Sequence, residues 1–160
     1  MRYFLVAAAV LFLFGTASAQ QFSINISTQP IWGPAGYDHV EYYYLPDIDA
    51  YYYVPQHQFI YLEGGQWRRV SNLPSRYRDF DLYNAHKVVI NDRTPYRQVN
   101  VHREKYANFK GVHDQQPIRD SHDAKYFVNK NHPEHNKWIE QNRHGQGNHG
   151  KGNKGNDRNR

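Results

Sequence analysis

The chain has 160 residues, no cysteine and a formal net charge of +5. This length fits a single small domain. The absence of cysteine excludes disulfides and thiolate metal sites, so the fold must be held together by an apolar core alone. Fourteen tyrosines, eight phenylalanines and three tryptophans supply aromatic side chains for that core.

The first nineteen residues have the pattern of a secretory signal peptide. Arg2 precedes the apolar run "YFLVAAAVLFLFG", which is too short to span a bilayer comfortably. Small residues at Ala17 and Ala19 suit a cleavage site that leaves a mature chain beginning at Gln20. We therefore expect an exported protein that is periplasmic, attached to the cell surface or secreted, and that is neither membrane-spanning nor lipidated.

Charge is divided unevenly along the sequence. Residues 20–63 contain five acidic side chains and no Lys or Arg. Residues 64–109 contain nine basic and four acidic side chains, and residues 110–160 contain ten basic and six acidic ones together with six of the ten histidines. The pattern predicts an acidic half joined to a basic half, followed by a basic tail.

A β-rich domain is predicted over residues 31–110, after an N-terminal extension over residues 20–30. The segment "DHVEYYYL" is typical of a strand, and Pro46 ends it. In "DIDAYYYV", from Asp47 to Val54, apolar and mixed positions alternate with period two. This alternation predicts a second strand with one apolar face and one mixed face.

A hairpin is predicted around Gly64-Gly65, because a type I′ turn needs positive φ at both central residues. The β-branched and aromatic segment "QFIYLE" precedes the two glycines. The resulting register pairs Leu62 with Trp67, which we expect to form a core pair. It also places Arg68 opposite the ring of Tyr61.

A fifth short strand is predicted in "HKVVIND", at residues 86–92. Thr94 and Pro95 have the pattern of a helix start and Gly111 that of a stop, so a helix is predicted from Pro95 to Lys110. The expected fold class is α+β and β-rich: a small antiparallel meander of four to five short strands with one C-terminal helix, followed by a disordered basic tail.

The C-terminal part is predicted to lose order in two steps. Residues 111–142 keep a few apolar side chains and are expected to be a partly ordered polar extension, in which Pro133 opens a short helix that carries Trp138. Residues 143–160 contain no aliphatic or aromatic side chain. Such a segment cannot bury enough surface to offset its ordering entropy, so disorder is predicted there.

Three stretches together resemble a group of small exported, tyrosine-rich bacterial envelope proteins of unknown function: "GPAGYDHVEYYYLPDIDAYYYVPQHQFIYLEGGQW", "LPSRYRDFDLYNAHKVVIND" and "NKNHPEHNKW". The resemblance lies in a signal peptide, a tyrosine-rich meander that ends in Gly-Gly-x-Trp, and a polar basic tail. It covers about residues 31–140. It implies an exported envelope protein and brings neither an activity nor site residues.

The two tyrosine triplets have two interpretations. Tyrosine combines an apolar ring with a hydroxyl that can stay hydrated, so the triplets suit the core of a thin sheet and its rim. Alternatively, Tyr51 and Tyr53 with Asp47 and Asp49 form a glycan-stacking platform of rings and carboxylates. The Asp-x-Asp pair also has the oxygen ligands that a hard cation prefers, although aspartate is common beside turns.

The basic tail predicts binding of anions, because Lys and Arg attract phosphates and sulfates. The candidate anion-binding residues are Lys125, Lys130, Lys137, Lys151 and Lys154. Export argues against genomic DNA and favours an anionic envelope polymer or glycan as the partner. The alternative for the tail is a solubilising spacer.

The tail histidines predict a second kind of site. His132 and His135 lie three residues apart and would share a helix face, and His144 and His149 follow. Imidazoles in this arrangement suit Zn, Cu or Ni, while the alternative is a solvated tail with incidental histidines. No other cofactor is predicted.

No catalytic signature is present in the sequence. His39-Val40-Glu41 matches the start of the zinc-deaminase pattern, but the cysteines of that pattern are missing. There is no nucleophile elbow, P-loop or dinucleotide fingerprint. We therefore expect a non-enzymatic envelope-associated binding or structural protein with a basic tail for anionic polymers. A transition-metal-binding tail is the alternative, and a hydrolase of envelope polymers is third.

Overall fold

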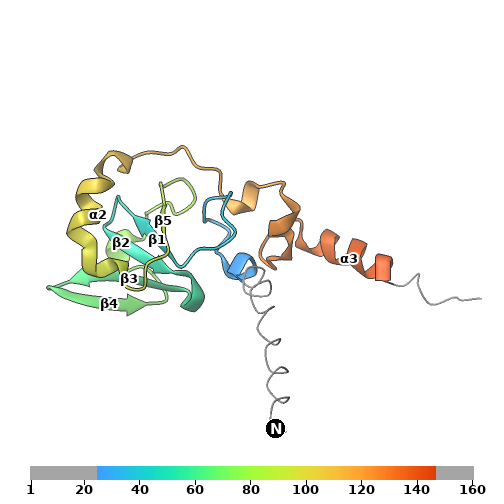
Figure 1. The fold of residues 1–160 in the computed structure, drawn as a ribbon, viewed down its shortest axis with the longest axis horizontal. Helices are drawn as coiled ribbons and strands as arrows, with labels where there is room; N and C mark the ends of the chain where they lie inside the picture. Colours follow the sequence, from blue (N-terminus) through green and yellow to red (C-terminus); the bar gives the residue numbers. More distant parts are fainter. Residues whose placement is uncertain (1–24, 147–160) are drawn as a thin grey trace, which may run out of the picture.

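The computed structural model describes residues 25–146, and Figure 1 shows a strand-rich body from which one helix extends. Five strands form a single sheet in the order β4-β3-β2-β1-β5, and every neighbouring pair is antiparallel. The strands are β1 (Tyr42–Leu45), β2 (Ala50–Tyr53), β3 (Gln58–Glu63), β4 (Gln66–Val70) and β5 (Val88–Ile90). The predicted β-rich α+β class and its antiparallel meander are confirmed.

Strand β2 begins later than the alternation predicted. Residues 46–49 form the turn between β1 and β2, and the N–H of Ile48 donates to the Leu45 carbonyl at 3.3 Å. Asp49 has a φ of 49°, a left-handed conformation that cannot continue a strand. Asp47 and Asp49 are therefore turn residues. Proline and aspartate are both common in turns, and Pro46 precedes them.

The predicted hairpin is confirmed in its turn and in its register. Gly64 and Gly65 have φ values of 57° and 76°, and Leu62 lies opposite Trp67. The expectation of a core pair is wrong, because Leu62 is 37 % exposed and Trp67 is only half-buried. This end of the hairpin lies at the edge of the sheet and carries few covering side chains.

The ring of Tyr61 is covered by a different arginine from the one predicted. Arg68 lies 3.7 Å from a carboxylate oxygen of Glu63, whereas the guanidinium of Arg76 lies 4.9 Å from the centre of the Tyr61 ring. Arg76 also pairs with Glu63 at 2.9 Å. The segment after β4 therefore folds back over the hairpin. The pairing of neighbouring strands could not predict this contact, because Arg76 lies outside the strands.

Both faces of the sheet are buried, and the tyrosine triplets supply both. One face carries the core of Val40, Tyr43, Leu45, Ala50, Tyr52, Val54, Phe59 and Tyr61. The other carries Tyr42, Tyr44, Tyr51, Ile60 and Ile90, which pack with Val99 of helix α2 (Val99–Lys105). The interpretation of the tyrosines as core and rim is confirmed, since successive side chains of a strand point to opposite faces.

The helix predicted over residues 95–110 is present in three parts. Short 3₁₀ segments, Pro95–Gln98 and Ala107–Phe109, flank α2, and Gly111 follows with a φ of 70°. His102 of α2 is buried, and its Nδ1 lies 2.7 Å from the Tyr51 hydroxyl. Figure 1 shows α2 lying along the sheet beside β2 and β3.

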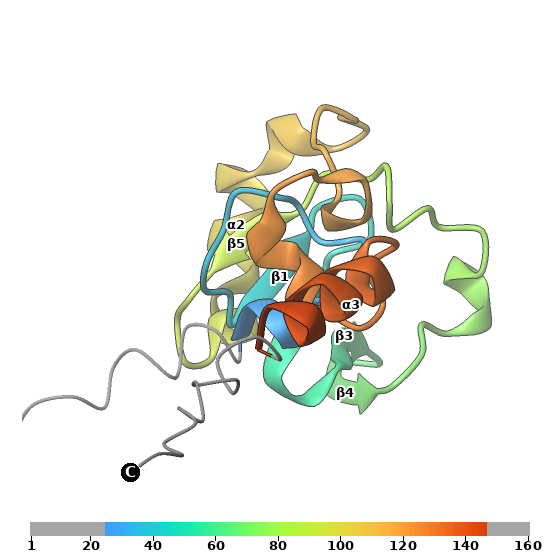
Figure 2. The ribbon, with the colours of Figure 1, turned by 90° about the vertical axis from the view of Figure 1, so that its right-hand side faces the viewer.

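The segments on either side of this body pack against each other. Ile26, Ile118 and Tyr126 form a third buried cluster, and a single bridge joins Pro34 to Pro117. Figure 2 shows the C-terminal segment lying across the N-terminal one. The domain boundaries predicted near residues 30 and 110 are therefore crossed by core contacts.

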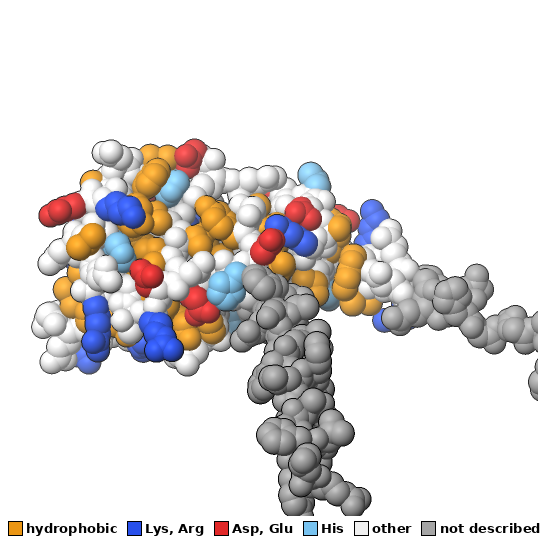
Figure 3. All heavy atoms as spheres, viewed as in Figure 1, with side chains coloured by type: hydrophobic (Ala, Val, Ile, Leu, Met, Phe, Trp, Pro, Cys, Tyr) orange, Lys and Arg blue, Asp and Glu red, His pale blue; other side chains and the backbone are white. Residues whose placement is uncertain are grey.

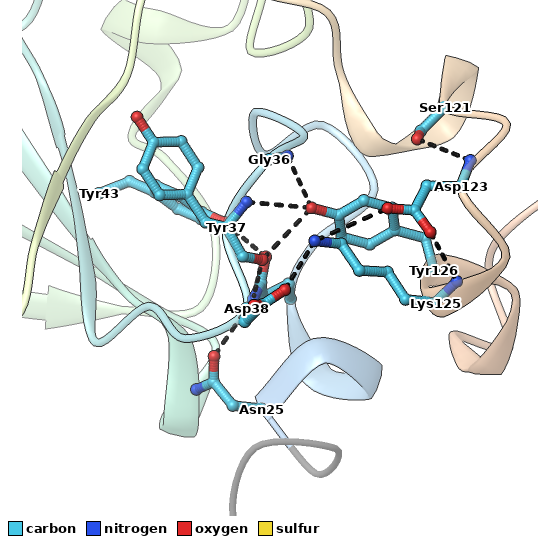
Figure 4. A network of polar contacts seen from close by, with 10 residues as sticks. Asn25, Gly36, Tyr37, Asp38, Tyr43, Ser121, Asp123, Lys125 and Tyr126 are labelled. Atoms are coloured by element: carbon cyan, nitrogen blue, oxygen red, sulfur yellow. Dashed lines mark hydrogen bonds and ion pairs between the residues drawn. The ribbon is translucent and has the colours of Figure 1, made fainter.

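Hydrogen bonds hold this joint together, and Figure 4 shows those of the Tyr126 hydroxyl with Gly36 and Tyr37. The Tyr126 hydroxyl accepts from the N–H groups of Gly36 and Tyr37 at 2.7 and 3.1 Å and donates to the Tyr37 carbonyl at 3.2 Å. The amide of Asn25 exchanges two bonds with the backbone of Val40, at 2.7 and 3.0 Å. Asn25 begins an Asn-x-Ser pattern, and in the folded body its side chain is buried.

Helix α3 (His135–Gln146) ends the described chain and carries Trp138, as predicted. It includes residues 143–146, which the sequence places in the tail, and the rest of the predicted tail lies outside the described residues. The predicted signal peptide also lies outside them. None of the helices within residues 25–146 is long and apolar enough to cross a membrane.

Candidate functional site

A cavity of about 640 Å³ lies where three parts of the chain meet. The N-terminal segment forms one wall, the end of β2 and the turn after it form the floor, and the C-terminal segment adjoins the wall as a rim. The lining residues are Ser27, Thr28, Gln29, Pro30, Ile31, Trp32, Tyr52, His57, Lys130 and Asn131. This volume is within the range of small-molecule sites, which are about 300–1,000 Å³.

The floor of the cavity is aromatic. The Trp32 ring is half-buried and meets the Tyr52 ring edge-on, with 4.8 Å between the ring centres. Trp32 also stacks against Phe59 at 6.3 Å, so its orientation is set by the core. Burial raises the pKa of Tyr52 to about 12, so its phenol is neutral at physiological pH.

The imidazole of His57 lies beside this floor. His57 adopts a left-handed conformation with a φ of 53°, immediately after the 3₁₀ segment Val54–Gln56. That backbone turn places its Nδ1 at 3.2 Å from the Tyr52 hydroxyl. The ring itself is exposed, so it adds a polar group to the edge of the cavity.

The wall of the cavity is held in place by buried hydrogen bonds of side-chain amide groups. The side chain of Gln29 donates to Asn25 at 3.2 Å and accepts from the Tyr43 hydroxyl at 3.2 Å. The Gln29 carbonyl accepts from the side chain of Asn129 at 2.6 Å. Because its polar groups are engaged, Gln29 shapes the wall, whereas the Thr28 hydroxyl donates to Asn25 and keeps lone pairs for a ligand.

The rim carries the positive charge of the site. Lys130 and Asn131 are exposed, and no Asp or Glu is among the ten residues that line the cavity. Within residues 25–146, no carboxylate lies at ion-pair distance from Lys130. At neutral pH the site therefore combines aromatic rings, hydroxyl and amide groups, one imidazole and one ammonium.

Only one of the five predicted anion-binding lysines belongs to this cavity. Lys125 forms ion pairs with Asp38 at 2.6 Å and Asp123 at 3.7 Å, and its hydrogen bond to Asp38 raises its pKa. Lys137 lies 3.7 Å from Glu134 on the same helix. Lys151 and Lys154 lie outside the described residues. Of the three predicted lysines that the structure describes, Lys125 and Lys137 are paired with carboxylates and Lys130 lines the cavity.

The predicted glycan platform is wrong as a set of four residues. Tyr51 is fully buried under α2, and Tyr53 is half-buried and stacks on Tyr42 with 4.7 Å between the rings. Asp47 accepts from the Gly111 N–H at 2.6 Å. The alternation of the strand explains the outcome, because the intervening Tyr52 points to the opposite face and lines the cavity.

The second carboxylate of that set is also engaged within the protein. Asp49 accepts from the Tyr44 hydroxyl at 2.9 Å and pairs with Arg103 at 3.3 Å and Lys110 at 3.8 Å. Its left-handed backbone turns it toward α2. Asp47 and Asp49 therefore join the turn before β2 to α2 and to the segment that follows it.

Of the four predicted metal ligands, the structure describes the side chains of His132 and His135, and both are hydrogen-bonded within the protein. His132 is buried; its Nδ1 accepts from the Glu134 N–H at 3.1 Å and its Nε2 lies 3.2 Å from the Ser121 carbonyl, so both ring nitrogens are used. His135 bonds the Phe127 carbonyl through Nδ1 at 2.7 Å. His149 and the side chain of His144 lie outside the description, and no cluster of three or more His, Cys, Asp or Glu suited to a metal occurs within residues 25–146.

Sequence reasoning missed Trp32, Tyr52, His57 and Asn131 as neighbours in one site. They come from three segments that are far apart in the chain, and no local spacing links them. The available signals were an isolated tryptophan before the meander and the position of Tyr52 on the predicted apolar face. No protein-family model, curated protein or solved structure shows a match to this chain.

Proposed function

We propose that this is an exported, non-enzymatic binding protein that holds a saccharide unit of an envelope polymer in the cavity over Trp32 and Tyr52. The observation that carries the proposal is the combination of an aromatic floor with polar groups at the edge. A sugar ring has apolar C–H faces that pack on aromatic rings, and hydroxyls that bond to amide, hydroxyl and imidazole groups. Thr28, His57 and Asn131 supply such groups around the rings.

The ten lining residues favour binding over hydrolysis. Glycoside hydrolases generally use a pair of carboxylates on either side of the scissile bond. No carboxylate lines this cavity among the residues that the structure describes. The polymer-hydrolase alternative therefore has no support at this site.

Export is supported by the predicted signal peptide and by the resemblance to small envelope proteins. Cleavage after Ala19 removes only residues that lie outside the described body. Asn25, the first described residue, already bonds to Val40 in the core. The binding body is thus compatible with the predicted mature chain.

Titration of the mature chain with oligosaccharides from envelope glycans, followed by calorimetry, tests the proposal. We expect binding, and we expect Trp32→Leu to weaken it by about tenfold or more, which corresponds to roughly 1.4 kcal/mol. Trp138→Leu on α3 is the matched control, because it removes a half-buried tryptophan that is not among the cavity residues. Absence of binding to every glycan, or equal binding by a folded Trp32→Leu protein, would contradict the proposal.

A second candidate function is the binding of anionic polymers by arginines of the body. Arg69 lies over the Tyr96 and Tyr53 rings, at 5.6 and 6.0 Å, and donates to the Tyr96 hydroxyl at 3.2 Å. Arg97 follows Tyr96 in the chain, and the Arg93 carbonyl accepts from a tyrosine of the same ring cluster. None of the three arginines has an ion-pair partner within the described residues. They form a basic group distinct from the predicted tail lysines.

Binding to a sulfated polymer at low and high salt separates these two basic regions. Counterion release makes such affinity fall steeply with salt. Replacement of Arg69, Arg93 and Arg97 by Gln is expected to remove most of the salt dependence if the body binds. Replacement of the five predicted tail lysines by Gln would do so if the tail binds. Equal binding by both variants and the wild type would rule out both regions.

A further inference from the structure

The charges around the cavity point to a narrower ligand class than saccharides in general. Among the ten described lining residues, Lys130 alone carries a full charge at neutral pH, and no acid is there to balance it. The nearby lysines of the same C-terminal segment differ, since Lys125 and Lys137 each face a carboxylate. An unbalanced ammonium at the rim of a polar, aromatic cavity favours a negatively charged ligand.

The backbone around Lys130 is anchored on both sides. The Asn129 side chain donates to the Gln29 carbonyl at 2.6 Å and accepts from the Asn131 N–H at 3.1 Å. The N–H of His132 donates to the Asn129 carbonyl at 2.9 Å, and His132 is buried. The Lys130 backbone is therefore held against the cavity wall, and only its side chain is free to reach a ligand.

The geometry of the floor limits where the acid group of a ligand can lie. The half-buried ring of Trp32 would pack against the apolar face of the sugar, and Tyr52, which meets Trp32 edge-on and is 6 % exposed, would border that contact. Lys130 and Asn131 adjoin the wall formed by residues 27–32, because the side chain of the preceding Asn129 donates to the Gln29 carbonyl at 2.6 Å. An acid group on the edge of the sugar ring would meet the ammonium there, while hydroxyls would face Thr28 and His57.

We propose that the cavity is specific for an acidic saccharide, whose carboxylate or phosphate is recognised by Lys130 while its ring packs on Trp32 beside Tyr52. The inference rests on the proposed saccharide site and adds the ligand class and the residue that selects it. Lysine suits this role as a point charge that can meet either kind of acid group. A neutral sugar of the same shape would gain the ring contacts and lose the ionic one.

Calorimetric titration with matched oligosaccharides tests this specificity. The mature chain is titrated with an oligosaccharide that contains a uronic acid, with the same oligosaccharide carrying the neutral sugar, and with its sugar-phosphate analogue. We expect an affinity about tenfold higher for at least one acidic ligand than for the neutral one. The comparison of carboxylate with phosphate identifies which acid group is preferred.

Three variants test whether Lys130 causes the preference for acidic ligands. Lys130→Gln is expected to bind acidic and neutral ligands equally, and Lys130→Arg is expected to keep the preference because it keeps the charge. Lys137→Gln is the matched control: it removes an exposed lysine that is not among the cavity residues, and its preference should equal that of the wild type.

The outcomes separate this inference from the proposed function. Equal binding of acidic and neutral ligands by the wild type would overturn the acidic specificity while the saccharide site stands. A loss of preference in Lys137→Gln as large as that in Lys130→Gln would also overturn it, because the effect would then be general charge attraction. Binding of none of the three ligands would reject the saccharide site itself.

Discussion

At the residue scale, Lys87 is the most unusual side chain, because it is almost fully buried without an ion pair among the described residues. Its ammonium donates to the carbonyls of Leu82 and Tyr83 at 2.8 and 3.1 Å. Burial lowers its pKa to about 8, and the carboxylate of Asp81 opposes this shift only partly. The hydrogen bonds of Lys87 thus fix the loop before β5, while the burial of its charge is energetically unfavourable.

This shift predicts a pH dependence of stability that Lys87→Met should remove. The folded pKa of about 8 lies below the ordinary value of 10.5, so between these values the unfolded chain binds more protons. Stability contributed by this group therefore rises with pH over that window. Urea unfolding at pH 7 and pH 9.5 should show the wild type gaining on the order of 1–2 kcal/mol relative to Lys87→Met. An equal pH response of both proteins would show that Lys87 titrates normally.

At the scale of elements, the hairpin between β3 and β4 and the joint between the terminal segments depend on different interactions. The hairpin depends on two left-handed glycines, Gly64 and Gly65. A Cβ added at either position would meet no other atom within 4 Å, so the turn demands a backbone conformation and not space. The joint depends on the buried Tyr126 hydroxyl, which serves two backbone donors and one acceptor.

Replacement of Gly64 and Gly65 by Val is expected to destabilise the protein by about 2–4 kcal/mol. Each left-handed residue costs roughly 1–2 kcal/mol for a side chain with Cβ, and β-branched residues adopt this region poorly. Thermal and urea unfolding measure the loss. Gly64→Asn is the control, because asparagine tolerates the left-handed region and should preserve most of the stability. Unchanged melting of the double variant would exclude this turn geometry.

Tyr126→Phe is expected to lower the free energy of unfolding by about 1–3 kcal/mol, because the N–H groups of Gly36 and Tyr37 lose their acceptor. It should also increase proteolysis of the C-terminal segment and weaken ligand binding, since that segment carries the cavity rim. Tyr37→Phe is a suitable control, because Tyr37 is 39 % exposed. A Tyr126→Phe protein with the stability of the wild type would mean that water replaces the hydroxyl.

At the scale of the whole molecule, the uneven charge of the sequence is largely balanced by pairing between segments. Asp38 pairs with Lys125, and Asp49 pairs with Arg103. Glu63 pairs with Arg76. Figure 3 accordingly shows basic and acidic side chains intermixed on the face that it presents. Such exposed pairs each contribute roughly 0–1 kcal/mol, so they align segments more than they stabilise them.

The tyrosine core predicts cooperative alkaline unfolding of the whole body. Burial raises the pKa of Tyr43 well above the ordinary value of 10, and it raises the pKa of Tyr52 to about 12. Because the folded pKa values are the higher ones, their stabilisation is complete below pH 10 and is lost as the pH rises toward 12. Absorbance of tyrosinate and circular dichroism should therefore change together above about pH 10. Ionisation of all tyrosines near pH 10 in a protein that keeps its dichroism would contradict this.

Local patterns in the sequence were sufficient to predict the strands, the register of the hairpin and the approximate extent of the α2 region. These features depend on contacts between residues close in sequence: period-two alternation, glycine turns, and a proline at a helix start. Strand β2 began late because a single turn residue, Asp49, adopted a left-handed conformation that alternation cannot reveal. The separation of Tyr51 from Tyr52 onto opposite faces was implicit in the pattern, but which segments would cover each face was not.

The position of the cavity was decided by which segments cover each face of the sheet. Helix α2 covers Tyr51, whereas the N-terminal and C-terminal segments meet over Tyr52 and leave a cavity between them. Joining residues 27–32 to residues 130–131 closes a loop of about a hundred residues, and its contacts are long-range hydrogen bonds such as that from Asn129 to Gln29. No spacing in the sequence encodes such a meeting, because it depends on the summed packing of the whole chain.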